Sequence, residues 1–154
     1  MMGKLSAADI EEILSKQIVG RIGCHADGLT YVVPISYAYD GHYVYGHTHE
    51  GMKLSIMRKN PSVCFEVDEM QNMANWKSVI LQGKFEELDD PQLRKHALDT
   101  LNNRVLPIIS SVTTHLSPYW PFPPDDYKEI KGVVFRIAVL EKSGRFENDQ
   151  SGRP

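Results

Sequence analysis

The sequence predicts a mainly β domain with antiparallel strands and a few helices at its periphery. Apolar and polar residues alternate over several short runs, of which Ser62–Asp68 is the clearest, and this spacing is typical of half-buried strands. Asp-Gly pairs at 27–28 and 40–41 separate the first runs and favour tight hairpin turns. Strands and helices do not alternate regularly, which argues against a doubly wound parallel sheet. About six antiparallel strands are expected to close into a barrel or to pack as a sandwich.

One helix and three strands are expected in the first part of the chain. Ser6 is a suitable helix cap, and the residues after it include an apolar stripe of Ile10, Ile13 and Leu14. The strands are expected over Ile18–His25, Thr30–Tyr39 and His42–His47. Pro34 lies inside the second strand. Because proline donates no backbone hydrogen bond, that strand is expected to lie at an edge, to bulge or to open there.

The rest of the chain is expected to contain three more strands and two helices. They are predicted as a helix over Glu50–Arg58, a strand over Ser62–Asp68, a polar loop over 69–75, a strand over Trp76–Leu88, a helix that begins at Asp90-Pro91, and a strand over Gly132–Leu140. Four apolar residues of the second helix recur at helical spacing and are expected to form its apolar stripe: Leu93, Ala97, Leu98 and Leu101.

The segment from Leu106 to Tyr127 is long for a connection inside a compact domain. It combines five prolines with the aromatic residues Tyr119, Trp120 and Phe122. Loops of this length are typically lids, partner contacts or disordered segments, and the aromatic residues argue against plain disorder. We expect a single domain over residues 1–154, with a helical and proline-aromatic insertion at about 90–127.

Composition and charge argue against several classes of partner. The formal net charge is −3, so nothing favours nucleic acid or an acidic membrane surface. The apolar runs are far shorter than the ~20 residues that a membrane-spanning helix needs. No signal peptide is recognised, so we expect a cytoplasmic protein. Cys24 and Cys64 lie in apolar runs and are expected to be buried free thiols, with a disulfide as the alternative.

Common catalytic and metal motifs are absent from the sequence. No GxGxxG follows a strand, no GxxxxGK[ST] is present, and no nucleophile elbow surrounds a serine. His47 and His49 would share one face of an extended chain, but no cysteine or carboxylate joins them at a known ligand spacing. We therefore predict no metal site.

The most informative feature is the turn Tyr45–Leu54, read as YGHTHEGMKL, which joins the third strand to a helix. The N-terminus of a helix presents unpaired N–H groups and a positive dipole, and together these bind anions. Thr48 places a hydroxyl just before the helix, and Lys53 can fold back over the same position. This pattern favours a phosphate site. The alternative is that Thr48 only caps the helix and Lys53 is solvated.

Two further segments allow a ligand-binding or a structural interpretation. In Val33–Ser36 the proline leaves backbone groups that the edge of a flat heterocycle can use, and the alternative is an edge strand with a bulge. Trp76–Ser78 opens a strand after a polar loop, where its ring and hydroxyl would meet a ligand at a barrel end or across a dimer. The alternative is a tryptophan in the core.

Taken together, these segments resemble the pyridoxamine 5′-phosphate oxidase-like superfamily of FMN-binding split barrels, especially its short members related to nitroimidazole-resistance reductases. The resemblance covers Ile18–Leu88 and the final strand. It is carried by GRIGCHADGLTYVVPISYAYDGHYVYGHTHEGMKLSIMRKNPSVCFEVDE, WKSVILQGKFEEL and VFRIAVLEKSGRFE. It implies a six-stranded antiparallel split β-barrel with peripheral helices, forming a homodimer with FMN at the interface.

The resemblance also implies which residues bind FMN. The edge of the flavin ring would be contacted, largely through backbone, by Val33, Pro34, Ile35 and Ser36. The phosphate and ribityl chain would be held by His47, Thr48, Met52, Lys53 and Leu54. The neighbouring subunit would contribute Trp76, Lys77 and Ser78. His47 is the expected proton donor near the ring.

The implied activity is that of a flavin oxidoreductase, in which NAD(P)H supplies electrons to a nitro-aromatic or quinone-like small molecule. Two departures argue against oxidation of pyridoxamine phosphate itself. Met52 stands where the long oxidases place a basic residue, and their C-terminal arginine and histidine segment is not recognised in GRFENDQSGRP. The alternatives are a protein that binds FMN or haem without turnover, and a deazaflavin-dependent reductase on the same fold.

Overall fold

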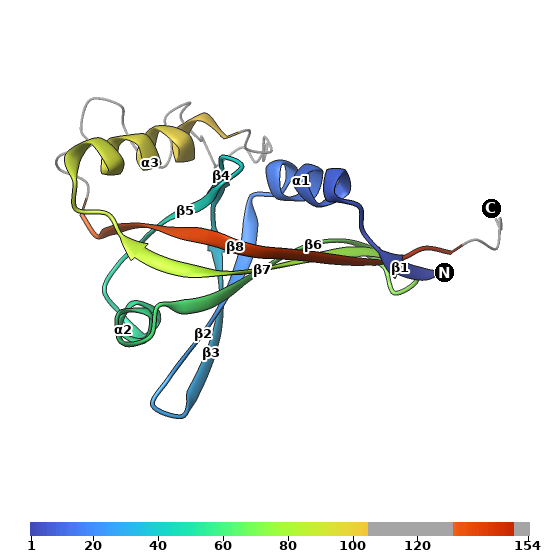
Figure 1. Cartoon of the computed structure of the whole chain (residues 1–154), viewed down its shortest axis with the longest axis horizontal. Helices are drawn as coiled ribbons and strands as arrows, with labels where there is room; N and C mark the ends of the chain where they lie inside the picture. The colour runs from blue at the N-terminus through green and yellow to red at the C-terminus, as the bar shows by residue number, and fades with distance from the viewer. Residues whose placement is uncertain (105–130, 150–154) are drawn as a thin grey trace, which may run out of the picture.

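The computed structural model describes residues 1–104 and 131–149, and these residues form eight strands and three helices (Figure 1). In chain order the elements are β1 (Met2–Lys4), α1 (Ala7–Lys16), β2 (Val19–Ala26), β3 (Leu29–Ser36), β4 (Ala38–Tyr39), β5 (Tyr43–Thr48), α2 (Met52–Lys59), β6 (Ser62–Asn72), β7 (Asn75–Glu87), α3 (Pro91–Asn103) and β8 (Val133–Glu147). The predicted lid or partner contact at Leu106–Tyr127 lies outside the described residues.

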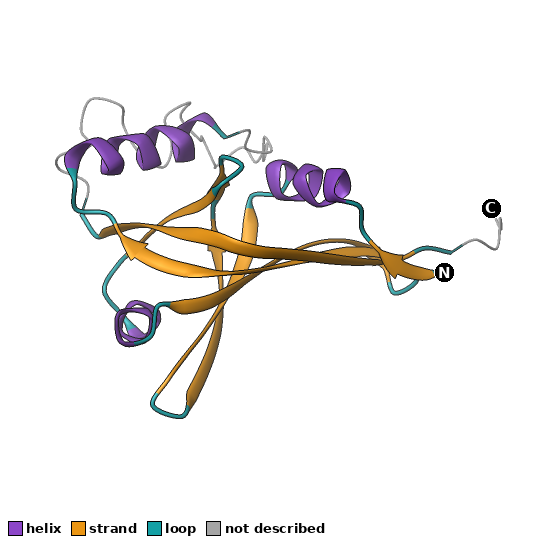
Figure 2. Ribbon diagram, in the orientation of Figure 1, coloured by secondary structure: helices purple, strands orange, loops and turns teal. Residues whose placement is uncertain are grey.

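The strands form one antiparallel sheet in the order β3-β2-β6-β7-β8-β5-β4, and β1 pairs with the far end of β8. The sheet coils around a core, and the helices lie outside it, α1 and α3 on one side and α2 on the other (Figure 2). The prediction of a mainly β, antiparallel split barrel is confirmed. The described strands number eight rather than six, because the short β1 was not predicted and the predicted strand Thr30–Tyr39 is divided into β3 and β4.

The second predicted strand, Thr30–Tyr39, is divided in the structure. β3 ends at Ser36, and the backbone N–H of Tyr37 donates to the carbonyl of Ile18 at 2.9 Å. The chain then leaves β2, and Ala38 pairs with Tyr45 of β5. Tyr37 fixes this bend because its buried hydroxyl donates to the carbonyl of Leu14 at 2.8 Å. The apolar alternation continues through the bend, so the sequence did not reveal it.

The prediction of a polar loop over 69–75 is wrong. β6 continues to Asn72 and β7 begins at Asn75, so only a two-residue turn joins them. The predicted end of the last strand at Leu140 is also too early, since β8 runs to Glu147. Both extensions lie where β1, β6, β7 and β8 form a ribbon that extends beyond the core. Cross-strand backbone bonds, rather than a buried face, hold polar residues in strands here.

Two groups of buried side chains stabilise the fold. The larger one fills the barrel and joins α1 and α2 to the inner faces of β2, β6, β7 and β8; its fully buried members include Leu54, Phe65 and Leu81. The smaller one lies between α3 and β5 and contains Leu98 and Tyr45. Of the stripe predicted on α3, Ala97, Leu98 and Leu101 are buried, whereas Leu93 lies on the first turn and is 40% exposed.

Local signals for caps and turns are confirmed. The Ser6 hydroxyl accepts a hydrogen bond from the backbone N–H of Asp9 at 3.2 Å, which caps α1. Asp27 and Gly28 both have positive φ, at 53° and 79°, as a two-residue hairpin turn requires.

Among the described residues, no helix is both long and apolar enough to cross a membrane.

Candidate phosphate-binding turn and ligand site

The turn between β5 and α2 presents a helix N-terminus that no side chain caps. Gly51 is the N-cap residue, its extended backbone brings the chain into α2, and no acidic residue lies in the first turn. The alternative in which Thr48 caps the helix is not what the structure shows, because its buried hydroxyl donates to the carbonyl of His49 at 3.3 Å. Main-chain N–H groups of the first turn therefore face outward without a side-chain acceptor, which is the arrangement that binds anions.

Lys53 brings a positive charge to the same turn. Its side chain is partly buried rather than fully solvated, and burial lowers the pKa of its ammonium. Within residues 1–104 and 131–149 this ammonium has no carboxylate partner at ion-pair distance. Lys53 interacts electrostatically with Cys24, a buried free thiol whose pKa is raised by burial, so the thiol is uncharged near neutral pH. A partly buried ammonium without a counter-ion favours an anionic ligand.

The other two residues predicted at this turn lie differently. Met52 is exposed at the start of α2, while the side chain of Leu54 has no exposed surface and belongs to the barrel core. Any ligand contact from Leu54 is therefore limited to its backbone N–H. Leu54 instead anchors the first turn of α2 to the sheet.

His47 is the second-to-last residue of β5 and pairs with Val134 near the start of β8. Its Nε2 lies 2.6 Å from the carbonyl of Lys131, and because a carbonyl only accepts, Nε2 carries the proton in this contact. Burial lowers the pKa of His47, so the neutral ring is favoured. The ring of His49 lies perpendicular to it at 5.3 Å. Within the described part of the chain, no three His, Cys, Asp or Glu side chains are grouped closely enough to hold a metal ion.

The segment Val33–Ser36 lies on β3, which is the edge strand of the described sheet. Pro34 pairs with Arg21 of β2 in uninterrupted register, so the expectation of an edge strand is confirmed and that of a bulge is not. The side chain of Val32 is 62% exposed next to this segment. The outer side of β3 is therefore open to a ligand or a partner.

Trp76, Lys77 and Ser78 begin β7 at the tip of the ribbon, which lies at the opposite end of the molecule from α2 (Figure 1). The indole N–H of Trp76 donates to Glu147 at 3.0 Å, and the Ser78 hydroxyl donates to Glu66 at 2.9 Å. Trp76 and Lys77 line a shallow hollow of about 140 Å³, so the alternative of a core tryptophan is wrong. Within one chain these residues do not meet the α2 turn.

Comparison of the sequence with known protein families identifies the family to which this chain belongs. A sequence profile described as pyridoxamine 5′-phosphate oxidase matches residues 6–146, which is most of the chain. The chain belongs to this family. The expected resemblance is thereby confirmed.

Individual relatives agree with that assignment. An uncharacterized protein of Rhizobium meliloti strain 1021 is 32% identical over 88 residues, so the match spans 57% of this chain and 58% of that relative's length. The structure of a FAD-binding protein from Mesorhizobium loti is 33% identical, with a TM-score of 0.71 over 96% of this chain and 99% of that one. A candidate 5-nitroimidazole antibiotic resistance protein from Bacteroides thetaiotaomicron shares the fold, with 21% identity and a TM-score of 0.69 over 95% and 89% of the two chains.

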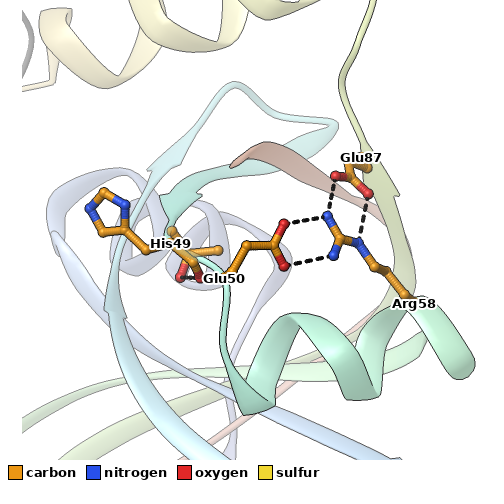
Figure 3. A network of polar contacts seen from close by, with 5 residues as sticks. His49, Glu50, Arg58 and Glu87 are labelled. Atoms are coloured by element: carbon orange, nitrogen blue, oxygen red, sulfur yellow. Dashed lines mark hydrogen bonds and ion pairs between the residues drawn. The ribbon is translucent and has the colours of Figure 1, made fainter. Parts of the chain in front are cut away.

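Sequence reasoning missed two features of this oxidase-family turn. Gly132 has a φ of 95°, and a Cβ there would lie 2.7 Å from the carbonyl oxygen of Thr48 and 2.9 Å from Nε2 of His47. Its position just before the last strand was the only available signal. The second feature is an ion-pair cluster of Glu50, Arg58 and Glu87, whose members lie up to 37 positions apart and carry no motif (Figure 3).

Proposed function

We propose that this pyridoxamine 5′-phosphate oxidase family member binds FMN and uses it as an oxidoreductase. The observation that carries the proposal is Lys53, whose partly buried ammonium lies beside an uncapped helix N-terminus and has no carboxylate partner among the described residues. A phosphate monoester, which carries about −1.5 to −2 charges at pH 7, suits both groups. The 33% identity to a FAD-binding protein from Mesorhizobium loti supports a flavin as the bearer of that phosphate.

The residues present fit FMN at two places, its phosphate and the edge of its ring. Lys53 and the first-turn N–H groups of α2 would hold the phosphate, and the open backbone of Val33–Ser36 would bond the edge of the ring. When bound, FMN supplies the hydride or electron transfer, with NAD(P)H as the donor and a nitro-aromatic or quinone-like molecule as the acceptor. The protein contributes binding, orientation and exclusion of water.

His47 is proposed as the proton-handling residue next to that ring. Its Nε2–H donates to the carbonyl of Lys131, so a further proton on the ring would go to Nδ1. The lowered pKa keeps Nδ1 unprotonated near neutral pH, so His47 acts more readily as a proton acceptor than as the donor expected from the resemblance.

A second copy of the chain is proposed to complete the site. The register of β2, β3, β6 and β7 puts four exposed apolar residues on one uncovered face of the sheet: Val19, Val32, Met70 and Ile80. Such a face favours association. A homodimer formed through it would place Trp76–Ser78 of one subunit near the ring bound by the other, which reconciles their role with their distance from α2.

Absorption of the purified protein tests the cofactor. We expect flavin bands, and chromatography of the supernatant after denaturation is expected to give FMN rather than FAD or riboflavin. FAD in the supernatant would correct the identity of the flavin. A Soret band without flavin bands would replace the proposal with haem binding, and a protein that takes up no cofactor would refute it.

Anaerobic mixing with NAD(P)H then separates an enzyme from a carrier. We expect the bound flavin to bleach within seconds and to recover its colour when a nitro-aromatic or a quinone is added. A holoprotein that stays yellow for minutes in excess NADH and NADPH would instead be a flavin carrier.

A further inference from the structure

The cluster of Glu50, Arg58 and Glu87 lies beside α2, and Glu50 belongs to the turn that leads into the proposed phosphate site (Figure 3). The guanidinium of Arg58 donates from Nη1 and Nη2 to the carboxylate of Glu50, at 2.7 and 2.9 Å. It also donates from Nε and Nη2 to Glu87 on β7, at 3.0 and 2.6 Å. Arg58 thus bonds two carboxylates in a bidentate manner, one from the turn and one from the sheet.

Glu50 immediately precedes the N-cap residue Gly51, and it is the only carboxylate in the turn between β5 and α2. Carboxylates are attracted to helix N-termini because they accept from the free N–H groups and interact favourably with the dipole. An unrestrained Glu50 would therefore compete with a phosphate for the same N–H groups and for Lys53. In the structure its carboxylate instead points over α2 to Arg58, in the last turn of the helix (Figure 3).

We propose that Arg58, oriented by Glu87, is a positioning residue that holds Glu50 away from the N-terminus of α2 and so keeps the phosphate site empty for its ligand. The inference rests on the proposed function, because the ligand is the phosphate of FMN. Arg58 comes from the last turn of α2, and Glu87 ends β7, where the next residue, Leu88, is bonded to Val134 of β8. The restraint on Glu50 is therefore attached to the sheet.

Three variants test this by flavin-fluorescence titration with FMN and with riboflavin, which lacks the phosphate. In Arg58→Gln the Glu50 side chain is released, so the Kd for FMN is expected to rise about tenfold, within the range of a helix-terminus charge interaction, while that for riboflavin is unchanged. In the double variant Glu50→Gln/Arg58→Gln the competing charge is gone. Its Kd for FMN is expected to return to within about threefold of the wild-type value.

The matched control is Lys59→Gln. Lys59 is the next residue of the same helix and forms an ion pair with Asp27 at 3.0 Å, so this variant also removes one positive charge and one ion pair from the last turn of α2. We expect its Kd for FMN to change by less than about twofold. An unchanged FMN affinity in Arg58→Gln, a double variant no tighter than the single one, or an equal loss for both flavins would each overturn the proposal.

If the proposed function is wrong, the titrations give a different result from the one that overturns the role of Arg58. If the wild-type protein binds neither FMN nor riboflavin, inorganic phosphate becomes the probe, followed through the backbone amide resonances of Met52 and Lys53. These are expected to shift with phosphate in the wild-type protein and the double variant, and far less in Arg58→Gln. The same response in all three proteins would overturn the positioning role by itself.

Discussion

The turn before α2 and the start of β7 are both candidate flavin contacts, yet one chain completes only the first. At the turn, Lys53 lies beside the N-terminus of α2, Leu54 anchors the helix in the core, and Arg58 restrains Glu50. At the start of β7, Trp76 and Ser78 bond to acidic residues on a ribbon that extends away from the core. In our proposal one chain supplies the phosphate grip, while the contacts of Trp76 and Ser78 with the flavin ring come from a second copy.

The largest expected effect concerns how the turn is anchored. Replacing Leu54 with alanine removes a side chain with no exposed surface, and the free energy of unfolding is expected to fall by about 3 kcal/mol. Urea denaturation measures it. Leu93→Ala, at a 40% exposed leucine on α3, is the control and is expected to lose much less. If Leu54→Ala and Leu93→Ala lower the free energy of unfolding equally, Leu54 does not anchor the turn to the core.

The second prediction tests the phosphate grip alone. Lys53→Ala is expected to weaken FMN about hundredfold, as the loss of a charge-assisted hydrogen bond does, and to leave riboflavin binding unchanged. The measurement is flavin-fluorescence titration, with Lys59→Ala as the control on the same helix. A Lys53→Ala variant that keeps full FMN affinity would refute the phosphate assignment.

The third prediction tests the dependence of the ring contacts on a partner. Ile80 is 43% exposed on the uncovered face, and Ile80→Asp is expected to dissociate the proposed dimer and to weaken the binding of FMN and riboflavin equally, by about tenfold. Analytical ultracentrifugation and flavin titration measure the two effects. Leu93→Asp alters a similarly exposed leucine on α3, and it should change neither. A wild-type monomer that binds flavin at full affinity would contradict the shared site.

The smallest expected effect is the contribution of His47 to stability. Burial holds its folded pKa below the usual value of 6.5, so between the two values the unfolded chain binds more protons. The stability that the folded protein gains from the neutral His47 ring is therefore fully present above pH 6.5. It is lost as the pH falls through the folded pKa. His47→Gln is expected to show a shallower fall in unfolding free energy between pH 7 and 5 by urea denaturation. Identical slopes would contradict this.

The sequence predicted the parts of the fold that rest on local signals. Ser6, Asp27-Gly28 and the alternation in Ser62–Asp68 gave a cap, a hairpin and a strand that the structure contains. The long ribbon was missed because residues 69–75 are polar, and pairing with neighbouring strands rather than burial makes them extended. Local periodicity carries no information about such pairing.

The candidate site could be predicted only where it is contiguous in sequence. The turn from His47 to Lys53 was found as a unit, because its glycine, its lysine and the helix start lie together. The restraint on Glu50 was not found, since Arg58 and Glu87 are 29 positions apart and meet only after β6 and β7 have paired. Ion pairs between distant surface residues follow from the fold and cannot be read before it is known.

Pro34 has a consequence for the solubility of this protein. β3 is an open edge of the described sheet, and an open edge is a template on which strands of other molecules can add. Proline is tolerated on an edge strand where its missing N–H would face solvent, so the outer side of β3 lacks a donor at this position. A strand added there would leave one carbonyl unpaired, which disfavours the growth of sheets from molecule to molecule and protects the protein against aggregation.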